Sequence, residues 1–127
     1  MTLVDTSVWI EFFRGHEPVA TQLEQLLDEN EVAVCGPVAM ELRRGIKSAR
    51  ERSRVMLLLG GCHELPQPAH LWDEAGDLGF VLARRGVSAK SLDLVIATYA
   101  LSHDVTLFST DSDFRAMKKA GVPLHLA

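Results

Sequence analysis

Cysteine, aromatic residues and long apolar runs are all scarce in this sequence. Of its 127 residues, two are cysteines and 6% are aromatic. The cysteines, Cys35 and Cys62, form no C-x-x-C motif, so we expect neither a disulfide framework nor a cysteine zinc site. No apolar run approaches the roughly 20 residues that a membrane-spanning helix needs, and residues 1–5 lack the pattern of a signal peptide. We therefore expect a cytoplasmic protein without a membrane segment.

An excess of positive charge is also missing. The chain has 13 lysines and arginines against 17 aspartates and glutamates, which gives a net charge of −4. Proteins that bind nucleic acid usually carry a basic excess, so the net charge taken alone argues against such a partner. The composition, 47% hydrophobic and 24% charged, is typical of a globular protein. At this length we expect residues 1–127 to form a single domain.

Short apolar runs alternate with helical patterns along the chain. The runs predict strands at 2–5, 31–35, 63–65 and 105–108, and a fifth strand or edge segment at 123–126. The spacing of apolar residues, with proline and glycine signals, predicts helices over 7–15, from Pro18 onward, after Pro37, and over 49–59, 69–85, 91–102 and 111–120. Strands that alternate with helices imply parallel crossovers, and therefore a parallel sheet with helices on both faces.

Five carboxylates follow predicted strands or lie near the starts of predicted helices. Asp5 ends the first strand, Glu41 lies one turn into the helix after the second strand, and Asp93 lies near the start of an apolar helix. Asp111 and Asp113 follow the fourth strand. Each has an ordinary explanation as a helix cap or a solvated side chain. Because the carboxyl ends of parallel strands meet at one edge of a sheet, however, we expect these side chains to form a cluster.

Such a cluster favours a bound cation. Carboxylates that lie close together repel one another and raise one another's pKa, unless a positive charge sits between them. Oxygen ligands without cysteine or histidine suit Mg²⁺ or Mn²⁺. One or two such ions can activate water and stabilise a leaving oxygen, which is the chemistry of phosphodiester hydrolysis.

Four carboxylate-bearing segments follow one another along the chain: Val4–Ile10, Val38–Leu42, Leu92–Ala97 and Ser109–Phe114. In content and order they resemble the PIN-domain ribonucleases, and more closely the VapC toxins of bacterial type II toxin–antitoxin pairs. The resemblance implies a three-layer α/β/α fold with a central parallel sheet of four to five strands. It also implies an endoribonuclease that depends on Mg²⁺ or Mn²⁺, with RNA as its substrate. Its partners would be a second copy in a homodimer and a cognate antitoxin protein, with which it could form a hetero-oligomer.

The resemblance implies a role for each acidic residue. Asp5 and Asp93 would be the central metal ligands, and Glu41 and Asp111 would coordinate the metal directly or through water. Asp113 would be a fifth acidic residue of the catalytic site, which orients water or caps the following helix. Hydroxyl groups would support these carboxylates: Thr6 and Ser7 through hydrogen bonds to Asp5, and Ser109 in place of the threonine usual in the family.

Basic residues are concentrated after Glu41. Residues 43–54 contain six basic residues and one acidic residue, and residues 11–31 contain six acidic residues and one arginine. Without the five proposed site carboxylates the chain has 12 acidic and 13 basic residues, so its negative charge no longer excludes RNA. We expect the acidic segment to face away from RNA. The candidates for contacts with RNA phosphates are Arg43, Arg44, Lys47 and Arg50.

Two other functions remain open on the sequence. A PIN fold that has lost catalysis could serve only to bind a partner, although the complete acidic set argues against this. A haloacid-dehalogenase-like phosphatase would use Asp5 as its nucleophile. That family requires a second aspartate two positions later, where this chain has Ser7.

Overall fold

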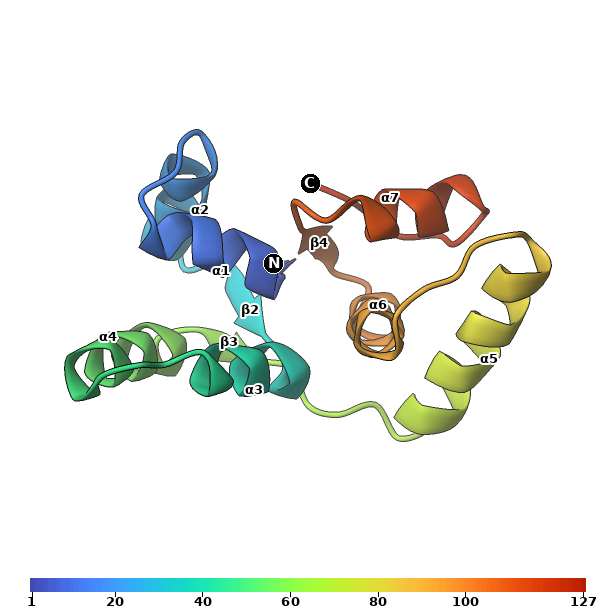
Figure 1. The fold of residues 1–127 in the computed structure, drawn as a ribbon, viewed down its shortest axis with the longest axis horizontal. Helices are drawn as coiled ribbons and strands as arrows, with labels where there is room; N and C mark the ends of the chain where they lie inside the picture. Colours follow the sequence, from blue (N-terminus) through green and yellow to red (C-terminus); the bar gives the residue numbers. More distant parts are fainter.

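The computed structural model describes residues 1–127, which form four short strands and seven helices (Figure 1). In chain order these are β1 (Thr2–Val4), α1 (Thr6–Phe13), α2 (Val19–Asp28), β2 (Val32–Val34), α3 (Gly36–Arg44), α4 (Ala49–Gly60), β3 (His63–Glu64), α5 (Leu71–Arg84), α6 (Ser91–His103), β4 (Thr106–Phe108) and α7 (Ser112–Lys119). The predicted alternation of strands and helices is therefore confirmed.

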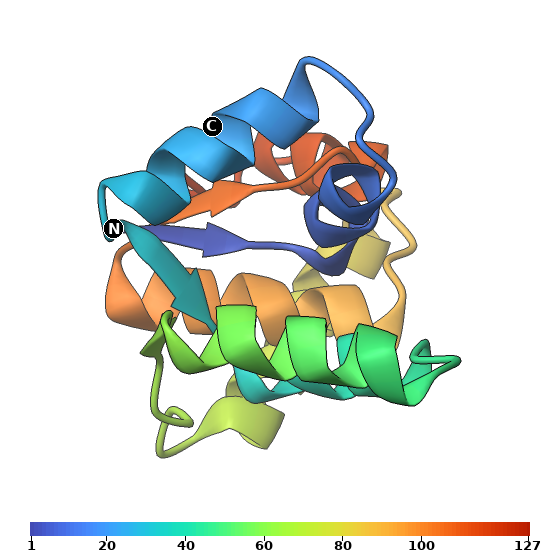
Figure 2. The same cartoon turned by 90° about the vertical axis from the view of Figure 1, so that its left-hand side faces the viewer.

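The four strands form one parallel sheet in the order β3-β2-β1-β4. Strand β1 lies between β2 and β4, as Figure 2 shows, and Leu3 pairs with Ala33 on one side and Leu107 on the other. Leu3 and Val4 are fully buried, because the sheet is covered on both faces. The carboxyl ends of β1, β2 and β4 consequently lie along the same edge.

Helices cover the sheet in two groups. Figure 1 shows the strands between α1–α4 on one side and α5–α7 on the other, which confirms the expected α/β/α arrangement. Helix α5 packs against α6, α1 packs against α2, and α3 contacts α1, α4 and α6. No helix combines the length and apolar character needed to cross a bilayer.

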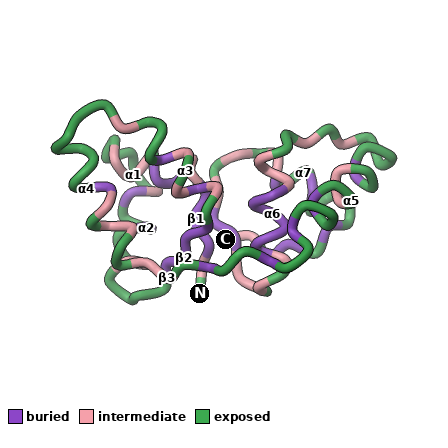
Figure 3. The backbone as a smooth tube through the Cα atoms, turned by 90° about the horizontal axis from the view of Figure 1, so that it is seen from below, coloured by how far each residue is buried: buried purple, intermediate pink, exposed green.

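Helix α6 runs through the interior, as its apolar sequence predicts. Figure 3 shows buried segments concentrated in the strands and in α6, where residues 95–100 are all buried. The hydroxyl of Thr98, one of these residues, donates a 2.7 Å hydrogen bond to the backbone oxygen of Leu94. The packing of α6 therefore fixes its first turn, which carries Asp93, at the edge of the sheet.

The C-terminal segment forms less sheet than a full strand would. A single parallel bridge joins Leu126 to Leu107, with hydrogen bonds from Leu107 N to His125 O and from Ala127 N to Leu107 O. Pro123 has no amide hydrogen to extend the pairing. The segment is instead anchored by the buried side chains of Val122 and Leu124.

Candidate acidic active site

The five predicted carboxylates all follow strands of the sheet or lie in helices that begin at its edge. Asp5 directly follows β1 and is the N-cap residue of α1, and Asp111 is the N-cap residue of α7 after β4. Asp93 and Asp113 lie in the first turns of α6 and α7, and Glu41 lies on α3, the helix after β2. Helix N-termini favour negative charge, so four of the five carboxylates lie where backbone dipoles stabilise them.

Three of these carboxylates form a compact cluster. Asp93, Asp111 and Asp113 each place one carboxylate oxygen within 4.8 Å of the others. The Oδ2 atom of Asp93 is buried and has no hydrogen-bond partner. An unpartnered buried carboxylate oxygen beside two other carboxylates is unfavourable without a cation. The donor set therefore fits a hard divalent cation such as Mg²⁺ or Mn²⁺.

The cluster perturbs the protonation of Asp93. Burial, followed by the side chain of Asp113 and the negative charges of Asp111 and Asp5, raises the pKa of Asp93 to about 7. The carboxyl group of Asp93 therefore binds a proton more readily than an ordinary aspartate does. A bound cation would compete with that proton for the same oxygens.

Asp5 is held by two hydroxyl groups. Its side chain is only 5% exposed, and its Oδ2 atom accepts hydrogen bonds from Ser7 Oγ at 2.7 Å and Ser109 Oγ at 2.8 Å. Ser109 Oγ in turn accepts a hydrogen bond from the backbone amide of Asp111 at 3.0 Å. Ser7 Oγ likewise accepts a hydrogen bond from the backbone amide of Thr110. These bonds connect the end of β1 to the loop between β4 and α7.

Thr6 differs from the expectation that it holds Asp5. Its Oγ1 atom donates a 2.7 Å hydrogen bond to Glu41 Oε1. Thr6 is the first residue of α1, which contacts α3, and its side chain extends toward that helix. The predicted hydrogen bond from Thr6 to Asp5 is therefore wrong. Thr6 follows Asp5 in the sequence, but its side chain points toward α3 and not toward the Asp5 carboxylate.

Asp5 and Glu41 do not belong to the group of three carboxylates whose oxygens lie within 4.8 Å of one another. The charge of Asp5 contributes to the raised pKa of Asp93. Both Asp5 and Glu41 also face Cys35, whose thiol pKa is raised to about 12, first by burial and then by these charges. The thiol of Cys35 therefore stays protonated beside these two carboxylates. The roles of Asp5 and Glu41 as metal ligands stay predictions.

Of the predicted phosphate-binding residues, Arg43 and Arg44 end α3, Lys47 lies in the connection to α4, and Arg50 lies in the first turn of α4. All four are exposed, and none takes part in an ion pair. Arg43 lines a cavity of about 290 Å³ that also contains Cys35 and Cys62. Arg54, which follows them on α4, instead lies over the rings of Phe12 and Phe13, at 5.9 and 5.1 Å from their centroids.

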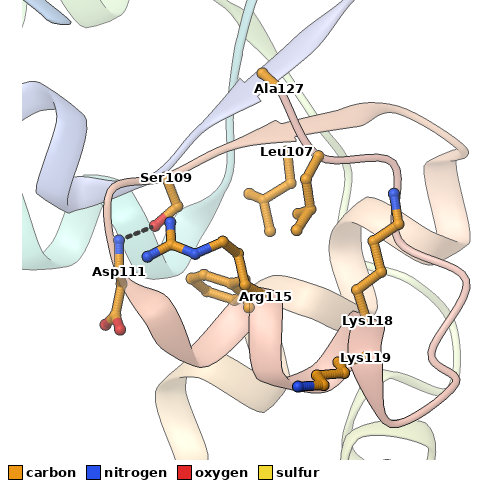
Figure 4. Close-up of a pocket in the computed structure, with 9 residues that line it drawn as sticks. Leu107, Ser109, Asp111, Arg115, Lys118, Lys119 and Ala127 are labelled. Carbon is orange, nitrogen blue, oxygen red and sulfur yellow. Dashed lines mark hydrogen bonds between the residues drawn. The ribbon is translucent and has the colours of Figure 1, made fainter.

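A second group of basic residues, which the sequence pattern did not single out, lies beside the acidic site. Arg115, Lys118 and Lys119 on α7 line a pocket of about 370 Å³ together with Ser109 and Asp111 (Figure 4). Their i, i+3, i+4 spacing places them on one face of the helix. The predicted helix over 111–120 already implied this spacing, but the pocket itself depends on the packing of α7 (Ser112–Lys119) against the C-terminal segment, which no sequence pattern indicates.

Comparisons with known proteins agree with this geometry. The profile of the PIN domain family matches residues 2–120. Ribonuclease VapC11 of Mycobacterium tuberculosis is 31% identical over 119 residues, which cover 90% of this chain and 89% of that protein. Ribonuclease VapC32 of the same organism is 33% identical over 129 residues, which cover 98% of this chain and 96% of that protein.

Solved structures show the same fold at lower sequence identity. The structure of VapBC2 from Rickettsia felis, bound to a DNA fragment from its promoter, matches with a TM-score of 0.77 and 20% identity. That match covers 99% of this chain and 96% of the other. VapBC-5 from Mycobacterium tuberculosis matches with a TM-score of 0.66 and 23% identity, over 99% of this chain and 94% of the other.

Proposed function

This chain belongs to the PIN domain family and, within it, to the VapC ribonucleases, and we propose that it hydrolyses RNA phosphodiester bonds with the help of a divalent cation. One observation carries the proposal. Asp93, Asp111 and Asp113 bring three carboxylate oxygens together, and Asp93 Oδ2 is buried without a hydrogen-bond partner. A site of this kind is stable only with a cation or a proton at its centre.

One or two Mg²⁺ or Mn²⁺ ions would be held by carboxylates as the protein ligands, directly or through water. Asp5 and Asp93 are the proposed central ligands, and Glu41, Asp111 and Asp113 complete the site. When bound, such a cation activates water and stabilises the oxygen that leaves phosphorus.

The surrounding residues hold these carboxylates in position. Ser7 and Ser109 orient Asp5 through its Oδ2 atom, and Thr6 orients Glu41 through Oε1. Hydrogen bonds to ligands restrict the rotation of their side chains and preserve the geometry that the cation requires. Contacts with RNA phosphates are proposed for the exposed basic residues near the end of α3 and the start of α4: Arg43, Arg44, Lys47 and Arg50.

The proposed partners follow from the relatives. Structures with the same fold include a toxin–antitoxin complex from Klebsiella pneumoniae and a member of the VapBC family of toxin–antitoxin systems. On this basis the chain is the toxin of a type II pair, acts in the cytoplasm, and is inhibited by a cognate antitoxin protein. It also forms a homodimer in this proposal.

The alternative phosphatase mechanism has little support in the site. A nucleophilic Asp5 would need a second carboxylate at position 7, but the hydroxyl of Ser7 donates to Asp5 there. A binding module without catalysis would have no need for the unpartnered Asp93 Oδ2 beside Asp111 and Asp113.

Cleavage of RNA by the purified protein tests the proposal. We expect cleavage with Mg²⁺ or Mn²⁺, none with excess chelator, and a loss of at least about 100-fold in Asp93→Asn. The matched control is Asp77→Asn, which removes the same charge from the exposed surface of α5 and should cleave normally. Equal cleavage by Asp93→Asn, or cleavage that persists in chelator, would refute the proposal.

A further inference from the structure

The pocket beside α7 extends directly from the acidic site. Ser109 and Asp111 line the pocket, and Ser109 Oγ also donates to Asp5 Oδ2. A ligand in the pocket would therefore lie next to the atoms that organise the proposed metal ligands. Its volume of about 370 Å³ lies in the range of pockets that bind small ligands or parts of larger ones.

The cations of this pocket are unpaired within the chain. Arg115, Lys118 and Lys119 are exposed, and none of them takes part in an ion pair. Figure 4 shows Arg115 extending across the pocket toward Ser109, while the two lysines come from the last turn of α7. Three unpaired cations around one pocket beside a carboxylate cluster can neutralise the anionic groups of a ligand that the cluster itself would repel.

The floor of the pocket is apolar. Leu107 and Phe114 belong to the buried core beneath the pocket, and the half-buried Leu126 with the exposed Ala127 provides the apolar surface that a ligand can reach. A basic rim over an apolar floor suits a nucleotide, because its phosphate can meet the cations while its sugar and base contact the floor. A free inorganic anion would use only the rim.

We propose that Arg115, Lys118 and Lys119 bind successive phosphates of the RNA strand next to the bond that is cleaved, with the adjoining nucleotide in the pocket they line. This inference rests on the proposed ribonuclease function and identifies a second group of phosphate contacts, separate from the basic residues near the end of α3 and the start of α4. The three residues position the RNA. They do not touch the reacting atoms.

A structural role is the competing explanation for the two lysines. Cations in the last turn of a helix interact favourably with the helix dipole, and Lys118 and Lys119 occupy that turn in α7. Arg115 lies one turn earlier, where this effect is weak. A comparison of Arg115 with the lysines therefore separates binding of RNA from stabilisation of the helix.

The test measures binding separately from cleavage. A fluorescein-labelled 20-nucleotide single-stranded RNA of mixed sequence is titrated, over a range of salt concentrations, with Asp93→Asn protein, which keeps the RNA intact. Further substitution of Lys118→Gln and Lys119→Gln should weaken binding about tenfold and reduce the salt slope by about 1.4, because each lost phosphate contact to a single strand contributes about 0.7. Adding Arg115→Gln alone to Asp93→Asn should reduce the slope by about 0.7.

The control removes two charges elsewhere. Arg14→Gln with Arg84→Gln, at the end of α1 and on α5, should leave the RNA affinity of the Asp93→Asn protein unchanged. An unchanged salt slope in both the lysine and the Arg115 variants would overturn the inference. The inference would also be overturned if these variants bound RNA normally but bound a polyglutamate peptide more weakly, because the pocket would then recognise an acidic protein segment. RNA cleavage by the unsubstituted protein tests the proposed function independently of either result.

Discussion

Ser109 Oγ donates a 2.8 Å hydrogen bond to Asp5 Oδ2, although the two residues are 104 positions apart in the sequence. The contact exists because β1 and β4 are adjacent parallel strands that end at the same edge of the sheet. Asp5 is almost fully buried, so its orientation depends on such donors rather than on water. The fold thus fixes a proposed metal ligand through a residue at the far end of the chain.

Ser109→Ala should reduce RNA cleavage by about 10- to 100-fold, because a ligand without its orienting partner binds metal less well. The lost hydrogen bond should lower the free energy of unfolding by about 1 kcal/mol. Cleavage rates and urea unfolding curves measure the two effects. Ser109→Thr keeps the hydroxyl and should retain most of the activity. Equal activity of the alanine and threonine variants would contradict the role given to this hydroxyl.

Thr6→Val should lower the cleavage rate about tenfold with little effect on folding. The substitution preserves the shape of the side chain and removes only the 2.7 Å hydrogen bond to Glu41. Thr6→Ser restores the donor and is the matched control. If Thr6→Val cleaves RNA as fast as the unsubstituted protein, the hydrogen bond does not position Glu41 for the reaction.

The raised pKa of Asp93 predicts a pH-dependent stability in the absence of divalent cations. Between the ordinary pKa of 3.8 and the folded value of about 7, the folded state binds more protons than the unfolded state. The contribution of Asp93 to the free energy of unfolding therefore falls as pH rises through this window. Chemical unfolding in chelator at several pH values between 4 and 8 measures the effect.

The control for this pH dependence is the difference between two variants. Asp93→Asn removes the titrating group. The free energy of unfolding of this variant should exceed that of the unsubstituted protein by the largest margin near pH 8. Asp77→Asn should show the original pH dependence, because Asp77 is exposed on α5. A pH profile of Asp93→Asn parallel to that of the unsubstituted protein would contradict the raised pKa.

Much of the fold and part of the site could be predicted from local patterns. The strand that ends at Asp5 and the apolar helix that contains Asp93 both appear where apolar periodicity and breaker residues indicate them. The placement of Asp5 and Asp111 at one edge of the sheet follows from one general rule, that the carboxyl ends of parallel strands meet at the same edge.

Features that depend on side-chain direction could not be predicted in this way. Thr6 and Ser7 are neighbours in sequence, yet one donates to Glu41 and the other to Asp5. The pocket lined by Arg115 depends on how α7 packs beside the C-terminal segment, whose pairing is reduced to one bridge near Pro123. Tertiary packing decides such contacts, and a single sequence carries no pattern for them.

Two glycines of α5 provide a test of the packing that positions α6. A Cβ atom on Gly76 would meet no atom within 4 Å, so Gly76→Ala should stabilise the helix by about 0.5–1 kcal/mol. A Cβ atom on Gly79 would lie 2.8 Å from Leu94 Cδ1, next to Asp93. Gly79→Ala should therefore be less stable than Gly76→Ala by about 1 kcal/mol, since Leu94 must repack. Thermal unfolding of both variants decides this, and equal stabilities would contradict the close packing of α5 on α6.

The proposed function depends on a divalent cation held by the cluster of Asp93, Asp111 and Asp113. This binding can be measured by calorimetric titration of the metal-free protein with Mn²⁺. We expect saturable binding of one or two ions, binding at least about tenfold weaker in Asp93→Asn, and unchanged binding in Asp77→Asn. Equal Mn²⁺ affinity in the unsubstituted protein and in Asp93→Asn would contradict the proposed cation site.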